Sequence, residues 1–595
     1  MIKISYLEEL HQVEISTNKP SKAFEEIRSG YAAGSTNLTL FSANRLVLPF
    51  WAFISSIQSL IYIIKKHATP YTLDSTMLNL IKKSASKRAS YKDFRKMEQI
   101  SPEKIKKLLK QKGFKRDLTP EQLRNVAKLY NFPAGATFTV PGGGKTTEAL
   151  ALFSLKKGSE QEKLFIVGPP IASVAWEKEI SKCLDYPYRF ANLTDGYDKI
   201  NKNLSLNPDI MYISYDQLLT VFDLVLNHLT KFDFFMCVDE SHRIKGGERV
   251  KRGKMLLSIA HLPEKKLIMS GTPLPNSTKD LIPQFKFLYP DCNFNESNIV
   301  HEMQDIFVRT TKEELEIPKY TIMLKRIKMS ESQEKIYNLL KSEELRRIEA
   351  LSKVELNMLR SLGRSSMKLL QAASNPSLLL TGLGTETQYR INQLITEDVS
   401  PKIKYVCSRV RELAANGKKV IVWTNFRKNV EQLTSLLVDL GADYIHGGVP
   451  SGSEDNPVTR EAKIKRFHND KMSFVLIANP AAAGEGISLH EVCNNALYLD
   501  RNYNAAQFLQ SIDRIHRYGL KKNTKTEIEI LISPYTIDES VQRRMEMKLE
   551  KMARVLNDPS LIVEMQYADE ETYDECNGLL LEDANDFIKH LKGWR

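Results

Sequence analysis

The residues best suited to chemistry form a glycine-rich turn that ends in Gly-Lys-Thr at positions 144–146. A short apolar run at 136–140 precedes the turn, and a helix-like run follows it. This order predicts a phosphate cradle, because backbone N–H groups and a helix N-terminus face the anion, while Lys145 reaches the β- and γ-phosphates and Thr146 holds Mg²⁺. The full pattern has glycine where this chain has Thr139, so an ordinary glycine-rich turn is the alternative. The residues expected to contact phosphate are Pro141, Gly142, Gly143, Gly144, Lys145, Thr146 and Thr147.

Asp239 and Glu240 form an acidic pair directly after the apolar run 234–238. The carboxyl end of a buried strand is the edge at which α/β sheets place their ligands. At such an edge Asp239 would hold Mg²⁺, directly or through water, and Glu240 would polarise the attacking water. The alternative is a strand that ends in a polar turn, which a phosphate loop in the same chain disfavours.

Arg514 and Arg517 lie three positions apart in a helix-like run at 510–517, so they share one helix face. Two arginines on one face could clamp a γ-phosphate. Arginines at this spacing also form ordinary surface ion pairs, so the pattern is weak when taken alone.

Lysine and arginine are concentrated in residues 82–116, where few acidic residues balance them. The whole chain has 85 lysines and arginines against 72 aspartates and glutamates, a net charge of +13, which favours an anionic partner such as nucleic acid. We expect Lys104 and Lys107, in a helix that begins near Pro102, to contact nucleic-acid phosphates. The alternative is a solvated helix face.

Strand-like and helix-like segments alternate around these residues. The alternation predicts parallel sheets flanked by helices, in one α/β unit before residue 296 and another after residue 400. The stretch between them is helical and charged. The apolar runs expected to form strands are 164–167, 210–213, 234–238 and 267–269, then 420–423, 474–477, 496–499 and 528–531.

The composition argues against a protein stabilised by zinc or disulfides and against a membrane protein. The six cysteines are scattered without a CxxC pair, which argues against a zinc site or disulfide framework and suits a reducing compartment. The N-terminus shows no secretory signal pattern. Residues 46–64 are apolar and long enough to span a bilayer, but polar residues and Pro49 interrupt them, so we expect a buried helix with Pro49 in its first turn. We expect no membrane partner and a cytoplasmic location, with the nucleoid in a prokaryote or the nucleus in a eukaryote as the place of action.

A second helix start lies just before the phosphate loop. Thr119 suits the N-cap, Pro120 the first helical position, and Gln122 the capping-box position. This local interpretation competes with a ligand-binding one for the same glutamine.

Taken in order, these motifs resemble the two-lobed motor of the superfamily-two helicases, and specifically its Swi/Snf-type ATPase branch. The resemblance covers about residues 118–552, and the departures from the branch at Thr139, Ser241 and Leu520 remove no catalytic group. The segments that carry it are 118–122, 144–146, 169–180, 213–215, 239–245, 270–276, 287–290, 445–450, 484–489, 510–519 and 536–539.

The resemblance implies an α/β fold with two RecA-like lobes on parallel sheets, a helical insertion between them and an N-terminal accessory region. It gives Gln122 the competing role of reading adenine and adds Gly486 to the nucleotide contacts. The residues that it implies as DNA contacts are Ser173, Trp176, Ser214 and Tyr215. The implied domains are 1–117 (accessory, basic toward its end), 118–295 (first lobe), 296–400 (helical insertion), 401–555 (second lobe) and 556–595 (acidic tail).

The family implies an ATP- and Mg²⁺-dependent, DNA-stimulated translocase on double-stranded or forked DNA, which hydrolyses ATP between its lobes. A strand-separating DNA or RNA helicase of the same superfamily is one alternative, and an ATP-gated nucleic-acid clamp that does not move is another. A protein partner could supply substrate specificity, and the sequence does not indicate an oligomeric state. The residues with implied catalytic roles are Lys145, Asp239, Glu240, Arg514 and Arg517.

Overall fold

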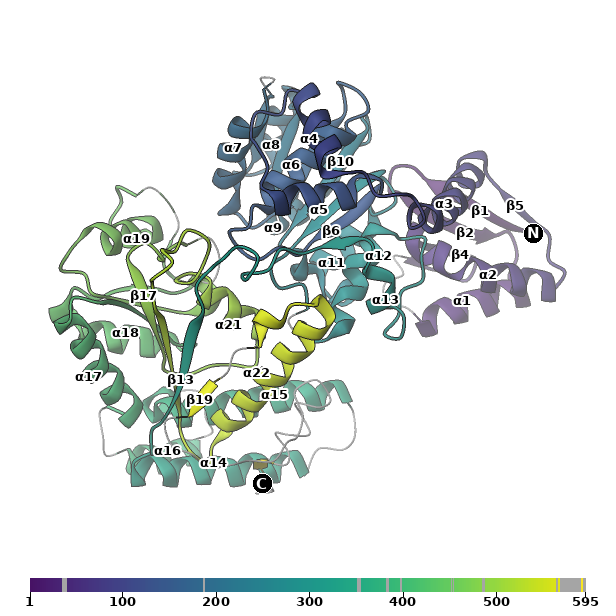
Figure 1. The fold of residues 1–595 in the computed structure, drawn as a ribbon. Helices are drawn as coiled ribbons and strands as arrows, with labels where there is room; N and C mark the ends of the chain where they lie inside the picture. The colour runs from purple at the N-terminus through teal and green to yellow at the C-terminus, as the bar shows by residue number, and fades with distance from the viewer. Residues whose placement is uncertain are drawn as a thin grey trace. The chain divides into compact units, whose positions relative to one another are not determined.

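The chain folds into two compact units, Met1–Thr310 and Thr311–Arg595, and both are α/β as expected (Figure 1). Each unit contains a seven-stranded sheet in which all paired strands are parallel. Gly486 and most of the expected acidic tail lie outside the described residues. The computed structural model describes residues 1–34, 40–185, 188–274, 276–349, 355–380, 385–395, 399–450, 452, 454–483, 487–562, 565–567 and 590–591.

The N-terminal region forms a small mixed sheet in the order β3-β4-β2-β1-β5, antiparallel except where β1 lies beside β5. The apolar stretch expected as one buried helix is divided, which corrects that expectation. Residues through Pro49 complete a strand, and Pro49 then caps the helix, because its fixed φ suits a helix start. No helix in the described parts of the chain is long and apolar enough to cross a membrane. The elements are β1 (Ile2–Leu7), β2 (Gln12–Thr17), α1 (Lys22–Gly34), β3 (Leu40–Phe41), β4 (Arg45–Pro49), α2 (Phe50–Lys66), β5 (Tyr71–Leu73), α3 (Ser75–Phe94) and α4 (Pro102–Gln111).

The first parallel sheet has the order β12-β6-β11-β10-β7-β9-β8. One strand, β11, separates β6 from β10, so the phosphate loop after β6 and the acidic pair after β10 share the carboxyl edge of this sheet. The elements are α5 (Pro120–Tyr130), β6 (Ala134–Thr137), α6 (Lys145–Lys156), β7 (Lys163–Gly168), α7 (Ala172–Cys183), β8 (Phe190–Leu193), α8 (Tyr197–Ser205), β9 (Ile210–Ser214), α9 (Tyr215–Thr220), α10 (Phe222–Leu229), β10 (Phe234–Asp239), α11 (Lys251–Ser258), β11 (Lys265–Met269), α12 (Leu281–Leu288), α13 (Ile299–Met303) and β12 (Phe307–Val308).

The core on one face of this sheet is built from apolar residues of α6 and the strands, such as Leu150 against Leu164. Ile105 and Leu109, from α4, belong to the same core. The amphipathic face of α4 is therefore buried on the first lobe, and the packing crosses the boundary expected at residue 118.

The second parallel sheet has the order β15-β16-β14-β17-β18-β13-β19. Its elements are β13 (Tyr320–Arg326), α14 (Glu331–Glu349), α15 (Glu355–Ser374), α16 (Thr385–Leu394), α17 (Pro401–Ala415), β14 (Lys419–Trp423), α18 (Arg427–Leu436), β15 (Asp443–Ile445), α19 (Arg460–Asn469), β16 (Val475–Ala478), α20 (Pro480–Ala483), β17 (Cys493–Tyr498), α21 (Ala505–Ile512), β18 (Thr526–Ile532), α22 (Ile537–Leu556) and β19 (Met565–Tyr567).

The segment 296–400 is helical over α14 to α16, but its first part differs from the expectation. Strand β12 joins the first sheet beside β6, and β13 joins the second sheet beside β18. Ile322 and Leu324, two positions apart in β13, are both buried, which is the alternation of a strand with one face on a core. The region between the lobes therefore completes both sheets.

Candidate nucleotide-binding site

Gly144 marks the point at which the glycine turn becomes helix α6. It caps the helix in a left-handed conformation (φ 85°, ψ 33°), and no side chain caps the N-terminal N–H groups. A Cβ on Gly144 would collide with the amide of Gln122, whose Nε2 donates to the Gly143 carbonyl at 3.3 Å. Only glycine combines this conformation with this close approach, and the uncapped helix N-terminus is the arrangement that binds phosphate.

Gln122 takes part in the capping box that the local sequence predicts. Its Oε1 accepts from the Thr119 N–H at 3.0 Å, while Thr119 Oγ1 accepts from the Gln122 N–H at 3.3 Å. The buried side chain thus fixes the start of α5 and touches the phosphate loop at the same time. The capping role is confirmed, and the adenine contact stays a prediction.

Lys145 Nζ donates to the Thr139 carbonyl at 2.9 Å, which joins the end of the phosphate loop to its start. Thr139 stands where the common pattern has glycine, and its side chain is fully buried. Its hydroxyl accepts from the Thr310 N–H at 3.2 Å. The departure from the pattern is therefore accommodated by hydrogen bonds within unit 1.

Glu148 places a buried carboxylate beneath the same loop. It accepts from the Thr137 hydroxyl at 2.6 Å and from Asn125 Nδ2 at 2.7 Å. Asn125 Nδ2 also donates to Thr310 Oγ1 at 2.9 Å. Burial raises the pKa of Glu148 to about 7, although the hydrogen bonds from Thr137 and Asn125 oppose the rise. Sequence reasoning missed this network, because no motif marks polar residues that meet only in the folded core.

Asp239 ends β10, and three donors hold it there. Trp176 Nε1 donates to Asp239 Oδ2 at 3.1 Å, and the Glu240 N–H donates to Oδ1 at 2.9 Å. The Tyr215 hydroxyl donates to the Asp239 carbonyl at 2.7 Å. Burial and the neighbouring Glu240 raise the pKa of this carboxyl, and Lys145 is close enough to lower it in turn.

Glu240 is held in the left-handed region (φ 50°) immediately after the strand. Its Oε2 lies 3.3 Å from His242 Nδ1, and the same nitrogen lies 3.0 Å from Ser270 Oγ. The Ser270 hydroxyl oxygen accepts in turn from the Thr272 N–H at 3.1 Å. His242 thereby connects the acidic pair to the loop after β11, a role that the sequence did not assign to it.

The four residues expected as DNA contacts in the first lobe all make hydrogen bonds within that lobe. Trp176 and Tyr215 are each 1% exposed, and their polar atoms bond to Asp239. Ser173 is also buried and donates to the Pro170 carbonyl at 3.0 Å. Ser214 caps α9 by accepting from the Gln217 N–H at 3.2 Å. Trp176, Tyr215 and Ser173 are thus buried and support the acidic pair and its surroundings, whereas Ser214 is half-buried at the start of α9. A contact of these residues with DNA stays a prediction.

Arg514 and Arg517 have different environments in unit 2. Arg514 is buried, and its guanidinium donates to the carbonyls of Gln510 and Ile487 at 2.8 Å each. The side chain of Arg517 makes no hydrogen bond or ion pair with another described residue, and burial lowers its pKa. Arg517 is therefore the better placed of the two to meet an anion.

The loop before β13 supports this arginine segment. Lys312 Nζ lies 2.5 Å from Asp513 Oδ1 in a largely buried ion pair. The same ammonium lies 3.2 Å from His516 Nδ1, and His516 Nε2 donates to the Pro318 carbonyl at 2.5 Å. Burial and then the Lys312 charge lower the pKa of His516 to about 4, so the ring is neutral near pH 7. No sequence signal marks Lys312, because it lies far from the motif along the chain.

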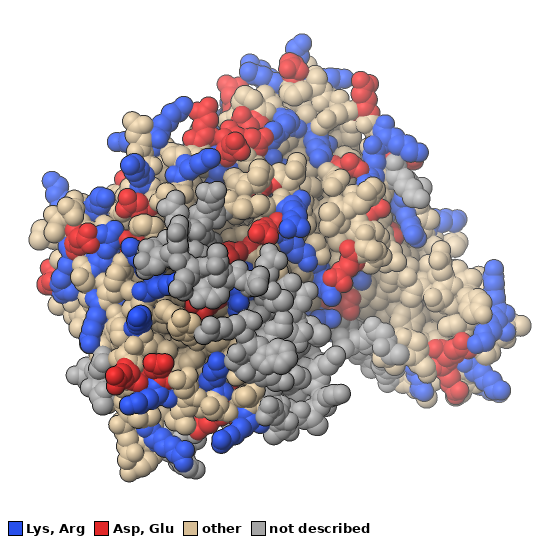
Figure 2. Space-filling view, turned by 60° about the horizontal axis from the view of Figure 1, so that its bottom comes forward, with Lys and Arg blue, Asp and Glu red and all other residues tan. Residues whose placement is uncertain are grey.

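The basic segment 82–116 divides into internal and exposed groups. Arg95 forms ion pairs with Glu302 at 2.7 Å and with Asp305 at 2.6 Å. Lys104 and Lys107 are exposed on α4, as a phosphate contact requires. Figure 2 shows lysines and arginines scattered among acidic residues on the face in view, not gathered into one patch.

The residues present fit a nucleotide with Mg²⁺. The loop offers backbone donors without side chains, and the Thr146 hydroxyl and Asp239 carboxylate are the hard oxygen ligands that Mg²⁺ prefers. No cluster of three or more His, Cys, Asp or Glu that could hold a metal occurs among the residues that the structure describes. Mg²⁺ does not need one, since it is commonly held by one or two protein groups together with substrate phosphates.

Comparison with known proteins agrees with this geometry. Residues 126–298 match the SNF2-related domain, and residues 401–519 match the helicase conserved C-terminal domain. The chain is similar to the ATP-dependent helicase fft2 of Schizosaccharomyces pombe, with 24% identity over 502 residues that cover 69% of this chain and 38% of that protein. It is also similar to a probable chromatin-remodeling complex ATPase chain of Oryza sativa subsp. japonica, with 26% identity over 483 residues, 75% of this chain and 41% of that protein.

The chain spans about two fifths of the length of these relatives.

Among solved structures, the SWI2/SNF2 ATPase core of Sulfolobus solfataricus in complex with dsDNA is similar over 79% of this chain and 100% of that chain, with 18% identity and a TM-score of 0.33. The two matched domains follow one another in the order of the two parallel sheets. The chain therefore contains an SNF2-related domain followed by a helicase conserved C-terminal domain, which confirms the expected resemblance to the Swi/Snf-type ATPases of the superfamily-two helicases.

Proposed function

We propose that this chain is an ATP-dependent, DNA-stimulated translocase on double-stranded or forked DNA. The observation that carries the proposal is the gathering of Lys145, Asp239 and Glu240 at the carboxyl edge of one sheet, close enough to shift the pKa of Asp239. A phosphate-binding cation, a Mg²⁺ ligand and a base in one place fit hydrolysis of a nucleoside triphosphate.

Each residue has a distinct role in this proposal. Mg²⁺–ATP supplies the phosphoanhydride bond when bound. Lys145 would neutralise charge on the β- and γ-phosphates, while Thr146 and Asp239 would hold the metal. Glu240 would orient the attacking water and accept its proton, with its Oε2 kept in place by His242. Arg517 would stabilise the charge that develops in the transition state.

The DNA part of the proposal rests on charge and on the relatives. The net charge of +13 and the exposed Lys104 and Lys107 favour a polyanionic partner. The matched relatives include proteins named as an ATP-dependent helicase and as a probable chromatin-remodeling complex ATPase chain. We propose duplex DNA as the partner that stimulates turnover, in the nucleoid of a prokaryote or the nucleus of a eukaryote, and a further protein as the source of substrate choice.

The deciding experiment measures ATP turnover with and without duplex DNA, together with strand displacement on a forked substrate. Stimulated turnover without strand displacement is expected for a translocase. Displacement of the strand would favour the strand-separating helicase, and nucleotide-dependent DNA binding without turnover would favour the clamp. Absence of any turnover in the presence of Mg²⁺ and DNA would contradict the proposal.

A further inference from the structure

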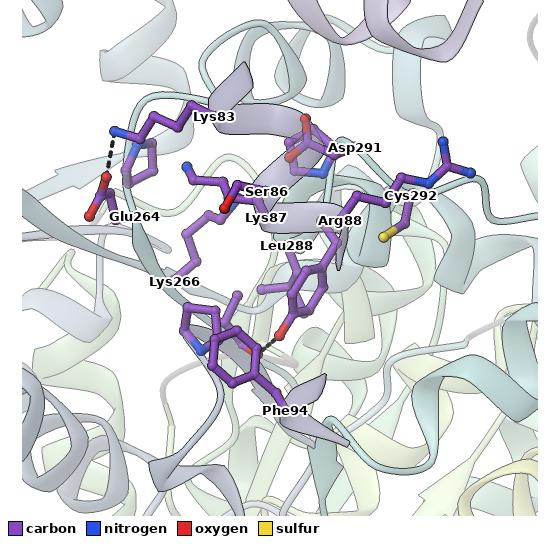
Figure 3. A pocket seen from close by; sticks show the side chains of 15 residues that line it. Lys83, Ser86, Lys87, Arg88, Phe94, Glu264, Lys266, Leu288, Asp291 and Cys292 are labelled. Atoms are coloured by element: carbon purple, nitrogen blue, oxygen red, sulfur yellow. Dashed lines mark hydrogen bonds and ion pairs between the residues drawn. The ribbon is translucent and has the colours of Figure 1, made fainter. Parts of the chain in front are cut away.

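A cavity of about 330 Å³ lies inside unit 1, between helix α3 of the N-terminal region and the edge of the first parallel sheet (Figure 3). Four cationic side chains line it: three from α3 and one from β11. They are Lys83, Lys87, Arg88 and Lys266. Nothing in the proposed ATP chemistry uses this cavity, because none of the residues that line it belongs to the phosphate loop, the acidic pair or the arginine segment.

The acidic residues of the cavity are already engaged. Glu264 forms an ion pair with Lys83, and Asp291 accepts from the Ser84 hydroxyl. The side chains of Lys87 and Arg88 form no hydrogen bond or ion pair with another residue that the structure describes, although the Asp291 and Glu264 carboxylates are near enough to act on the pKa of Lys87. The cavity therefore contains two cationic side chains that no carboxylate of a described residue binds directly.

Lys266 adds a buried amine from below. Its Nζ donates to the carbonyls of Ala260 and Phe287, at 2.8 and 2.9 Å, and it forms no ion pair with a carboxylate of a described residue, although Asp291 is near enough to act on its pKa. Burial lowers the pKa of Lys266 well below its usual value, and the charge of Lys87 lowers it further. Burial and the charge of Lys83 lower the pKa of Lys87 in the same direction. Crowded and partly desolvated cations are stabilised when an anion joins them.

The remainder of the wall offers little that would bind a cation or a neutral polar group. Phe94 and Leu288 contribute apolar surface, and the Tyr289 hydroxyl already donates a hydrogen bond to the Ala134 carbonyl at 2.6 Å. Figure 3 shows Lys87 extending from α3 on the same side as Ser86 and above Lys266. The available donors are thus one ammonium and one guanidinium, the pair of groups that proteins use for phosphate oxygens.

We propose that this cavity is a second phosphate-binding site, in which Lys87 and Arg88 hold a phosphate group of a nucleic-acid backbone or of a phosphorylated small molecule. A phosphate bound here would connect α3 to the first parallel sheet, because Lys87 and Arg88 lie on α3 and Lys266 lies on β11. The inference does not depend on ATP hydrolysis. Only its nucleic-acid form rests on the proposed function.

The first test is thermal unfolding in millimolar phosphate against chloride at equal ionic strength. The full chain carries Lys145→Ala throughout, so that the phosphate loop does not contribute. We expect phosphate to raise the melting temperature by about 2 °C or more, since a ligand that binds only the folded state stabilises it. The rise should be lost in Lys87→Ala and Arg88→Ala. It should remain in Lys82→Ala, which removes an exposed lysine of the same helix that does not line the cavity.

The second test separates the two sources of phosphate. The salt dependence of duplex DNA binding is measured for the same variants with Lys145 intact. A backbone contact predicts that Lys87→Ala and Arg88→Ala each reduce the slope by about one unit, whereas Lys82→Ala does not. An unchanged slope together with a lost phosphate effect assigns the site to a small phosphorylated ligand. Equal phosphate effects in all variants would overturn the proposal, while the ATPase assay tests the proposed function separately.

Discussion

At the scale of single residues, the proposed chemistry depends on where Glu240 is held. The residue is left-handed (φ 50°), a conformation that costs a non-glycine residue about 1–3 kcal/mol unless its surroundings enforce it. The surroundings are the bond from its N–H to Asp239 Oδ1 and the contact of Oε2 with His242 Nδ1. The strained backbone of Glu240 at the end of β10 is therefore coupled to the position of the Glu240 carboxylate.

Glu240→Gln should block hydrolysis and leave ATP binding nearly unchanged. The amide cannot accept the proton of the attacking water, whereas Lys145 and the phosphate loop still bind the nucleotide. We expect turnover to fall by roughly 10²–10⁴. The measurement is ATPase rate beside nucleotide affinity, with Glu177→Gln on the exposed face of α7 as the matched control. Turnover within about tenfold of the wild type would remove Glu240 from its proposed role.

Glu148 permits a sharper test of the network beneath the loop. Glu148→Ala removes the acceptor of both the Thr137 hydroxyl and the Asn125 amide, so it should reduce the free energy of unfolding by about 1–3 kcal/mol for each unsatisfied group. Glu148→Gln keeps an acceptor and nearly the same volume, and should cost much less. Urea unfolding of both variants measures the difference. Equal losses would show that the network contributes no more than packing.

At the scale of elements, the N-terminal sheet is attached to the first lobe by side chains from β1 and α2. Lys286 Nζ of α12 lies 3.7 Å from the centroid of the Trp51 ring. The Tyr6 hydroxyl lies 2.7 Å from His261 Nε2. Burial lowers the pKa of His261 to about 3, so this ring is neutral near pH 7. Aromatic packing thus holds two different sheets in one compact unit.

Trp51→Ala should loosen this attachment without unfolding the first lobe. Loss of a buried tryptophan costs about 3–5 kcal/mol, and here the loss falls on the contact between the sheets. We expect faster proteolysis and amide exchange in β1 and β2, with exchange in β7 and β10 unchanged. Tyr62→Ala is the control, because Tyr62 lies on the same helix and is 67% exposed. Equal acceleration across the whole unit would contradict the expectation.

The sequence predicted the strand, glycine turn and helix around Lys145 well, because these elements are neighbours along the chain. It could not predict that β13 would lie beside β18, since these strands are some two hundred residues apart and their pairing depends on the whole sheet. It could not show which way Trp176 points either. A tryptophan in a family motif can face the solvent or the core, and here a bond to Asp239 inside the lobe decides. Long-range packing accounts for these differences.

At the scale of the whole molecule, the proposed catalytic groups are divided between two compact units. Lys145 and Glu240 belong to Met1–Thr310, whereas Arg514 and Arg517 belong to Thr311–Arg595. The spacing of the two arginines in the sequence does not distinguish them, but their contacts in the structure differ. Arg514 binds the Ile487 and Gln510 carbonyls, and Arg517 has no such bond to a described residue. We therefore propose a positioning role for Arg514 and a catalytic role for Arg517.

Arg517→Ala should therefore lower ATP turnover far more than nucleotide affinity. A cation supplied by the other unit acts on the transition state more than on the bound nucleotide, and its loss costs roughly 10³-fold or more in rate. Stimulation by duplex DNA should be lost together with the rate, while the free energy of unfolding stays close to that of the wild type, because no internal hydrogen bond is removed. Arg514→Ala should also slow turnover, but should in addition destabilise unit 2, since two buried carbonyls lose their donor. ATPase rate and nucleotide affinity, each with and without DNA, together with urea unfolding of both variants, separate the two roles. If Arg517→Ala reduced affinity and turnover in equal proportion, Arg517 would be an ordinary binding residue, and cooperation of the two units in hydrolysis would lose its main support.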